Sequence, residues 1–294
     1  MQTPGTAHSR ELRHAVMLPT PSQLPMYAPS IRPASDQDGD NRWATPIPVA
    51  LAFIAAELAA ALLSDTIGLI AYFSILFALL MIAAMINDHK ERRFLTSAAL
   101  VPIMRLAHFA MPLNELSEPY RLLLECLPTL IGMGATMRAT ATTPEEIALT
   151  SSFPKSQWTI ATSGIPLAVV GYIALKPDPL VPGITLETWQ DALIPSLVLA
   201  IYAGFVNIAI FQGMIQHSML PLAQSRSSIS TLLLVAVMYT ITQTEHLSPF
   251  FSAYTLGTGI FYAWAVKRTG TIWGTSIASG ITAIGIYILI PSMM

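Results

Sequence analysis

The sequence contains little charge and almost no cysteine. Only 11% of its 294 residues are charged, whereas 53% are hydrophobic, and the mean hydropathy is +0.57. No soluble domain of this size hides that much apolar surface, so a soluble globular protein is excluded. The net charge of −2 excludes the basic field typical of nucleic-acid binding. The single cysteine, Cys126, excludes disulfide frameworks and thiolate zinc clusters, and we expect it to be a small packing residue.

Residues 1–43 differ in composition from the rest of the chain. They are rich in Pro, Ser, Thr, Gln and Asp and contain no apolar run, which predicts a solvated tail. The first apolar stretch begins only after Trp43, so a signal peptide is not expected and the tail should stay on the protein. We therefore divide the chain into this polar tail, a set of transmembrane helices at 44–190 and a second helical bundle at 191–294.

The remainder of the chain is a series of apolar runs. Most are close to the roughly 20 residues that a helix needs to cross a bilayer. They predict an all-α, polytopic transmembrane bundle of eight or nine spans. Pro102, Arg105, His108 and Pro112 fall within the third run, which makes its crossing the least certain. The runs lie at about 45–64, 67–86, 94–113, 119–137, 157–175, 191–213, 228–245, 249–266 and 271–290.

The basic residues predict an orientation if successive loops alternate between the two sides of the membrane. If the amino terminus is cytoplasmic, Arg121 and Lys176 are the only basic residues in the loops and at the ends of the runs that are placed on the outer side of the membrane. Cytoplasmic loops are usually enriched in Lys and Arg, so this distribution favours a cytoplasmic tail in a bacterial inner or photosynthetic membrane. The residues that fall inside are Arg42, Lys90, Arg92, Arg93, Arg138, Lys155, Arg226, Lys267 and Arg268.

Three charged residues lie well inside the apolar runs, away from their ends. Glu57 sits among small residues in the first run, Arg105 in the third and Glu125 in the fourth. Charged groups at membrane depth are costly and are usually paired. We expect a structural role for Glu57 across a close helix contact, and an Arg105–Glu125 pair between adjacent helices. A proton or small-solute transporter that uses these three residues remains an alternative.

His108 and His217 are the histidines closest to apolar surface. A neutral imidazole can ligate haem iron or the magnesium of a (bacterio)chlorophyll, so both are candidate pigment or haem ligands. Neither lies in a wider ligand motif, and a hydrogen-bonded structural histidine is the simpler interpretation. Bound lipid or carotenoid is equally compatible with such a bundle.

From about residue 192 the sequence resembles the CPBP family (CAAX proteases and bacteriocin-processing proteins), also called the ABI family, of intramembrane metal-dependent endopeptidases. Members carry, in order, EExxxR followed by Gly, then FxxxH, a Gly-rich helix, an Arg-Thr-Gly turn with Trp, and HxxxN. The corresponding stretches are Asn207-Ile-Ala-Ile-Phe-Gln212-Gly213, Tyr239-Thr-Ile-Thr-Gln243, Leu256-Gly-Thr-Gly259, Arg268-Thr-Gly-Thr-Ile-Trp273 and Ser279-Gly-Ile-Thr-Ala283.

The resemblance implies the fold but argues against the reaction. Family members hold a metal and activate water with their Glu and His residues, and those identities differ here. Asn207 and Ile208 stand for the glutamate pair, and Gln212 stands for the arginine. Gln243 replaces the first histidine, and Ser279 and Ala283 replace the last His/Asn pair. Since amides, a hydroxyl and aliphatic groups cannot replace carboxylate and imidazole ligands, we expect a degenerate member without the reaction.

Two functions from different classes follow. The first is a non-catalytic membrane subunit or assembly scaffold of a larger complex, for instance a respiratory or photosynthetic one, with lipids and other membrane subunits as partners. The second is a divergent protease of this family. A slipped alignment would offer Glu245 and His246 to such an enzyme, although it gains one metal ligand at most. The missing ligands favour the first function.

Overall fold

The computed structural model describes residues 45–110, 118–150, 153–180, 189–222, 228–243 and 248–293. The predicted tail at 1–43 and the pair Glu245–His246 lie outside these ranges. Within them the chain is all-α, which confirms the predicted class. Cys126 is free and buried, in agreement with a packing role.

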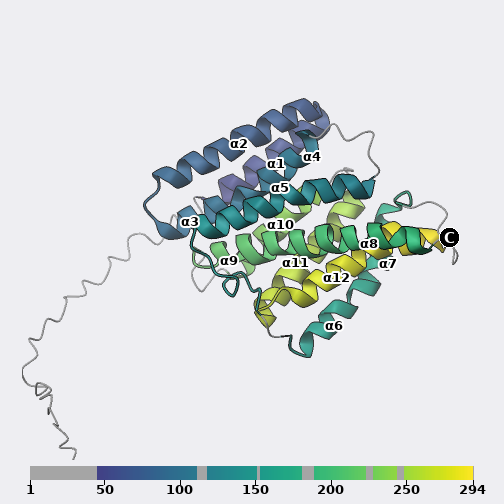
Figure 1. Cartoon of the computed structure of the whole chain (residues 1–294). Coiled ribbons are helices and arrows are strands. Elements are labelled where there is room, and N and C mark those ends of the chain that lie inside the picture. Colours follow the sequence, from purple (N-terminus) through teal and green to yellow (C-terminus); the bar gives the residue numbers. More distant parts are fainter. Residues whose placement is uncertain are drawn as a thin grey trace, which may run out of the picture. The chain divides into compact units, whose positions relative to one another are not determined.

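Nine helical stretches occupy the nine apolar runs in the described part of the chain (Figure 1). Several of them are interrupted or change their helical type along their length. The elements are α1 (Pro46–Leu62), α2 (Asp65–Met85), α3 (His89–Ala98), α4 (Leu100–Ala110), α5 (Glu118–Ala139), α6 (Ser156–Thr162), α7 (Gly164–Leu175), η3 (Trp189–Ala192), α8 (Leu193–Leu199), η4 (Ala200–Val206), η5 (Ala209–Ile215), α9 (Gln216–Met219), α10 (Ser228–Gln243), α11 (Pro249–Thr269), α12 (Trp273–Ile284), η6 (Gly285–Leu289) and α13 (Ile290–Ser292).

Local sequence explains where several helices begin and end. Pro46 occupies the start of α1, where its missing N–H has no helical partner to lose. The Ser64 side chain accepts from the backbone N–H of Ile67 and caps α2, and the Ser248 hydroxyl caps α11 in the same way. Gly270 ends α11 with a left-handed conformation that glycine adopts without steric cost.

Within the described ranges, five helical stretches are long and apolar enough to cross a membrane. The chain therefore has the features of an integral membrane protein, as the sequence predicts. Two further helices, Pro46–Leu62 and Ile229–Gln243, are apolar but shorter, so the prediction of eight or nine spans is matched in part. The five long stretches are Asp65–Met85, Pro119–Ala139, Ser156–Leu175, Trp189–Met219 and Trp273–Ser292.

The third apolar run forms two helices that differ in character. The polar α3 precedes the apolar α4. The helical hydrogen bonding continues between them, because the backbone N–H of Ala99 donates a hydrogen bond to the carbonyl oxygen of Leu95. The run is thus helical from His89 to Ala110. Its polar first part places basic side chains at one end of the bundle and its apolar second part carries Arg105 and His108 between helices.

The helix from Trp189 to Met219 lies at the centre of the bundle. Its middle residues, including Val206 and Phe211, are fully buried. Its two seven-residue π-helical segments, η4 and η5, contact α5, α10, α11 and α12. Figure 1 shows α1, α2 and α4 on one side of α5 and the helices of the last third on the other. The central helix therefore joins the two groups.

Most of the basic residues lie at one end of the bundle, where contacts connect loops and helix ends. Thr45 donates to Glu91, Arg93 pairs with Glu146, and the N–H of Ile272 donates to the carbonyl of Ala148. Of the basic residues in the described ranges, Arg121 and Lys176 lie at the opposite helix ends. The basic residues at the first end are Lys90, Arg92, Arg93, Arg138, Lys155, Lys267 and Arg268.

Candidate functional site

A small polar cavity lies in the last third of the chain. Its volume is about 70 Å³, and its wall comes from η4, α10, α11, α12 and η6. Three of the residues aligned with the family's catalytic positions line it: Gln243, Ser279 and Ala283. The fold therefore brings together the positions of the second and last motifs, although they are 36 or more residues apart in sequence.

The cavity wall is rich in hydroxyl groups, and several of them are engaged with backbone carbonyls. Ser279 Oγ donates to the carbonyl of Ala203 at 2.8 Å, and Tyr254 Oη donates to that of Leu167 at 3.0 Å. Thr282 Oγ1 donates to Ala278 at 2.8 Å and lies 3.4 Å from Tyr262 Oη. These bonds join α12 to the central helix and α11 to α7, so the polar groups of the cavity hold helices together.

The residues aligned with the first motif do not line this cavity. Asn207 and Ile208 are buried in the central helix, and Asn207 Oδ1 has no hydrogen-bond partner. Gln212 lines a second cavity of about 260 Å³ together with Gln216 and His217. The Gln212 side chain is only 1% exposed, and among the described residues neither of its amide atoms has a hydrogen-bond partner. Gln212 thus lines a different cavity from Gln243, Ser279 and Ala283.

The residues at these positions do not fit a catalytic metal. Across the described ranges, no three His, Cys, Asp or Glu side chains gather in an arrangement that would hold an ion. Among the described residues that line the small cavity there is no carboxylate and no imidazole. Hydroxyl and amide groups alone are poor ligands for the transition metals that activate water in proteases.

Glu57 is the centre of a buried polar cluster in the first half of the chain. Arg105 of α4 approaches it with both Nε, at 2.5 Å, and Nη2, at 2.9 Å, and Tyr72 of α2 donates to Glu57 Oε1 at 2.6 Å. The Arg105 guanidinium also lies over the ring of Phe109. The structural role expected for Glu57 agrees with this geometry, but Arg105 pairs with Glu57 in place of the predicted Glu125, although α4 packs against both α2 and α5.

Glu125 is fully buried in a second cluster. His108 Nδ1 lies 3.1 Å from its Oε1, and Tyr202 of the central helix donates to its Oε2 at 3.2 Å. Arg121, one turn earlier in α5, lies 3.6 Å away. His108 thus contacts a carboxylate, and a role for it as a pigment or haem ligand stays a prediction, as it does for the half-buried His217. Sequence reasoning missed Tyr72 and Tyr202, because a tyrosine in an apolar helix gives no sign of its partner.

Comparison with known proteins agrees with this part of the fold. Residues 189–284 match the family model described as type II CAAX prenyl endopeptidase Rce1-like. The match begins at the central helix and ends with α12, so it covers the residues that line the small cavity except Ile286 and Tyr287, and it agrees with the resemblance expected from about residue 192. No curated protein and no solved structure matches the chain. The chain has the long apolar helices of an integral membrane protein, and its C-terminal third is similar to the Rce1-like domain of the CAAX prenyl endopeptidase (CPBP) family.

Proposed function

We propose that this protein is a non-catalytic membrane subunit that serves as a scaffold or assembly partner in a larger membrane complex. The observation that carries the proposal is the lining of the small cavity. Three positions aligned with catalytic residues, Gln243, Ser279 and Ala283, lie together there with neutral side chains. The described residues that line the cavity are all uncharged, which supports a role other than catalysis.

Metal-dependent hydrolysis of a peptide bond requires ligands that keep a cation in place and leave one position open for water. Carboxylates supply negative charge and imidazoles supply a strong neutral donor. Gln243 supplies only an amide, and Ala283 supplies no polar group. Ser279 supplies a hydroxyl group that already donates a hydrogen bond to the carbonyl oxygen of Ala203. The arginine position is occupied by the uncharged Gln212. These identities favour a domain that has kept the fold and lost the reaction.

The same residues support a structural role. The Ser279–Ala203 hydrogen bond joins α12 to the central helix, and Gly204 lies against the carbonyl of Ser276 in the same contact. Small residues allow this close helix approach in a bilayer, where packing and hydrogen bonds stabilise helix pairs. The former catalytic region therefore has interactions that stabilise the bundle without a metal.

The proposal is tested with the full chain solubilised from its native membrane in a mild detergent. We expect other protein chains to co-purify at a fixed ratio, metal content far below one ion per chain, and no cleavage of a prenylated CAAX peptide. An active enzyme of the same family, purified in the same detergent, is the positive control. An absorption spectrum of the same sample tests the predicted pigment or haem.

Two results would overturn the proposal. The first is a protein that migrates alone under every mild condition. The second is peptide cleavage with a stoichiometric metal, which would support the divergent protease. Loss of that cleavage in a His246→Ala variant, with no loss in His89→Ala, would then assign the activity to the displaced motif.

A further inference from the structure

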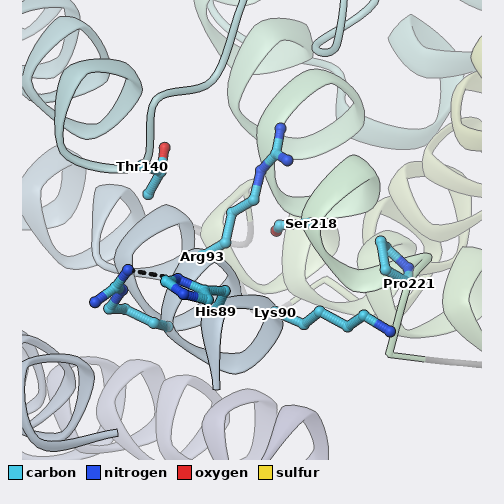
Figure 2. A pocket seen from close by; sticks show the side chains of 7 residues that line it. His89, Lys90, Arg93, Thr140, Ser218 and Pro221 are labelled. Atoms are coloured by element: carbon cyan, nitrogen blue, oxygen red, sulfur yellow. Dashed lines mark hydrogen bonds between the residues drawn. The ribbon is translucent and has the colours of Figure 1, made fainter. Parts of the chain in front are cut away.

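A cavity lined by basic side chains lies at the end of the bundle that collects most Lys and Arg residues. Its volume is about 180 Å³. Figure 2 shows the side chains around it: His89, Lys90, Arg92 and Arg93 come from the start of α3, and Thr140, Ser218 and Pro221 come from other parts of the chain. None of the described residues that line it is acidic. The cavity is therefore suited to an anion.

Two positive charges of this cavity are not compensated by acidic groups. Arg93 is paired with Glu146 at 2.6 Å, but Arg92 donates to Nδ1 of His89 at 2.7 Å, which is a neutral acceptor (Figure 2). This bond leaves the His89 proton on Nε2, where it can be donated to a ligand. Neither Lys90 nor Arg92 forms an ion pair with any acidic residue in the described ranges.

The position of the cavity along the bundle indicates the source of the anion. The apolar helix α2 ends at Met85, and α3 begins only four residues later at His89. Met85 and Ile82, in the last turn of α2, are 77% and 45% exposed. Exposed apolar side chains next to uncompensated basic ones mark the depth at which hydrocarbon meets lipid headgroups.

We propose that this cavity binds the phosphate group of an acidic phospholipid. Lys90, whose side chain extends toward Pro221 (Figure 2), is its direct charge partner, and Arg92, whose guanidinium is bonded to His89, adds a second positive charge to the cavity wall. Guanidinium and ammonium groups are the side chains that bind phosphate oxygens in proteins. Basic pockets between transmembrane helices on the cytoplasmic side are suited to anionic headgroups. A free phosphate ion offers the same oxygens, but only a lipid also places acyl chains beside Met85 and Ile82.

The test uses the purified full chain in a neutral detergent. Phosphatidylglycerol, cardiolipin, phosphatidylcholine or inorganic phosphate is added, and the melting temperature and the lipid retained in native mass spectrometry are measured. We expect the two acidic lipids to raise the melting temperature and to stay bound, and phosphatidylcholine and inorganic phosphate to have no such effect. In Lys90→Gln/Arg92→Gln the affinity for phosphatidylglycerol should fall roughly 25-fold, since each basic side chain near an acidic membrane surface contributes about fivefold.

The matched control is Lys155→Gln/Lys267→Gln, which removes the same charge from exposed residues at the same end but outside the cavity. It should bind acidic lipid like the wild type. The proposal is overturned if Lys90→Gln/Arg92→Gln binds phosphatidylglycerol as tightly as the wild type, or if the control loses as much affinity. It also fails if inorganic phosphate stabilises the protein as much as the lipid does. Should the double variant not fold, Lys90→Gln alone carries the test, with an expected fivefold loss.

Discussion

Arg105 of α4 and Glu57 of α1 form a two-point ion pair inside the bundle, with side chains that are 7% and 12% exposed. Tyr72 of α2 donates to the same carboxylate, so one acidic residue joins three helices. Charges at membrane depth usually have such partners, because an isolated one is costly. The pair explains how a chain with so little charge keeps two ionised groups within its apolar helices.

The first prediction concerns this pair. Glu57→Ala should destabilise the protein by about 3–5 kcal/mol, because it leaves a buried guanidinium without its counter-charge. Glu57→Leu/Arg105→Met removes both charges and should cost far less. Thermal unfolding in detergent of Glu57→Leu, Arg105→Met and the double variant measures the coupling. A loss in the double variant equal to the sum of the two single losses would show that the pair contributes no coupling.

The second prediction concerns the contact between the central helix and α12. A Cβ atom at Gly204 would lie 2.8 Å from the carbonyl oxygen of Ser276, so Gly204→Ala must separate the two backbones. We expect a loss of about 1–3 kcal/mol, the usual effect of overpacking. Gly257→Ala in α11 is the control, since its Cβ would meet nothing within 4 Å. That substitution should be neutral or stabilising by up to about 1 kcal/mol. Similar stability of both variants would contradict the close packing.

The helices were predictable from sequence because each apolar run of membrane-spanning length ends at charged, proline or glycine residues. Lys176-Pro177 and Arg268-Thr-Gly270, for example, separate helices in the structure. The partner of Arg105 was not predictable in this way. Spacing places a residue on a face of its own helix, whereas the choice between Glu57 and Glu125 depends on which helices pack together.

The candidate site was predictable in part. The order of family motifs placed Gln243, Ser279 and Ala283 together, and the structure agrees. The same order placed Gln212 with them, but Gln212 lines another cavity. The π-helical segments η4 and η5 contain an extra residue per turn, so they change which residues of the central helix face each neighbour. A comparison of sequence motifs that assumes regular α-helical spacing does not reveal which residues a π-helical segment turns toward each neighbour.

The third prediction concerns pH. The backbone N–H of Thr143 and, after it, the Arg93 guanidinium hold the pKa of Glu146 below its ordinary value. Since the folded-state pKa is lowered, this stabilisation is fully present above the pKa of the unfolded chain, about 4.3, and is lost as the pH falls through the folded value. The difference in melting temperature between wild type and Glu146→Gln should therefore be largest near neutral pH and should vanish in acid. Glu145→Gln serves as the control, and a pH-independent difference for Glu146→Gln would contradict the assignment.

The last prediction compares two buried glutamines. Among the described residues Gln212 has no hydrogen-bond partner for either amide atom, whereas Gln157 Oε1 accepts from the backbone N–H of Gly274 at 2.5 Å and only Gln157 Nε2 is unpaired. A buried polar group without a partner costs about 1–3 kcal/mol, so Gln212→Met should raise the melting temperature. Gln157→Met removes the unpaired Nε2 but leaves the N–H of Gly274 unsatisfied, so it should not raise the melting temperature. If Gln212→Met instead destabilises the protein, its amide has a partner that is absent from the described residues, and the second cavity is a binding site for that group.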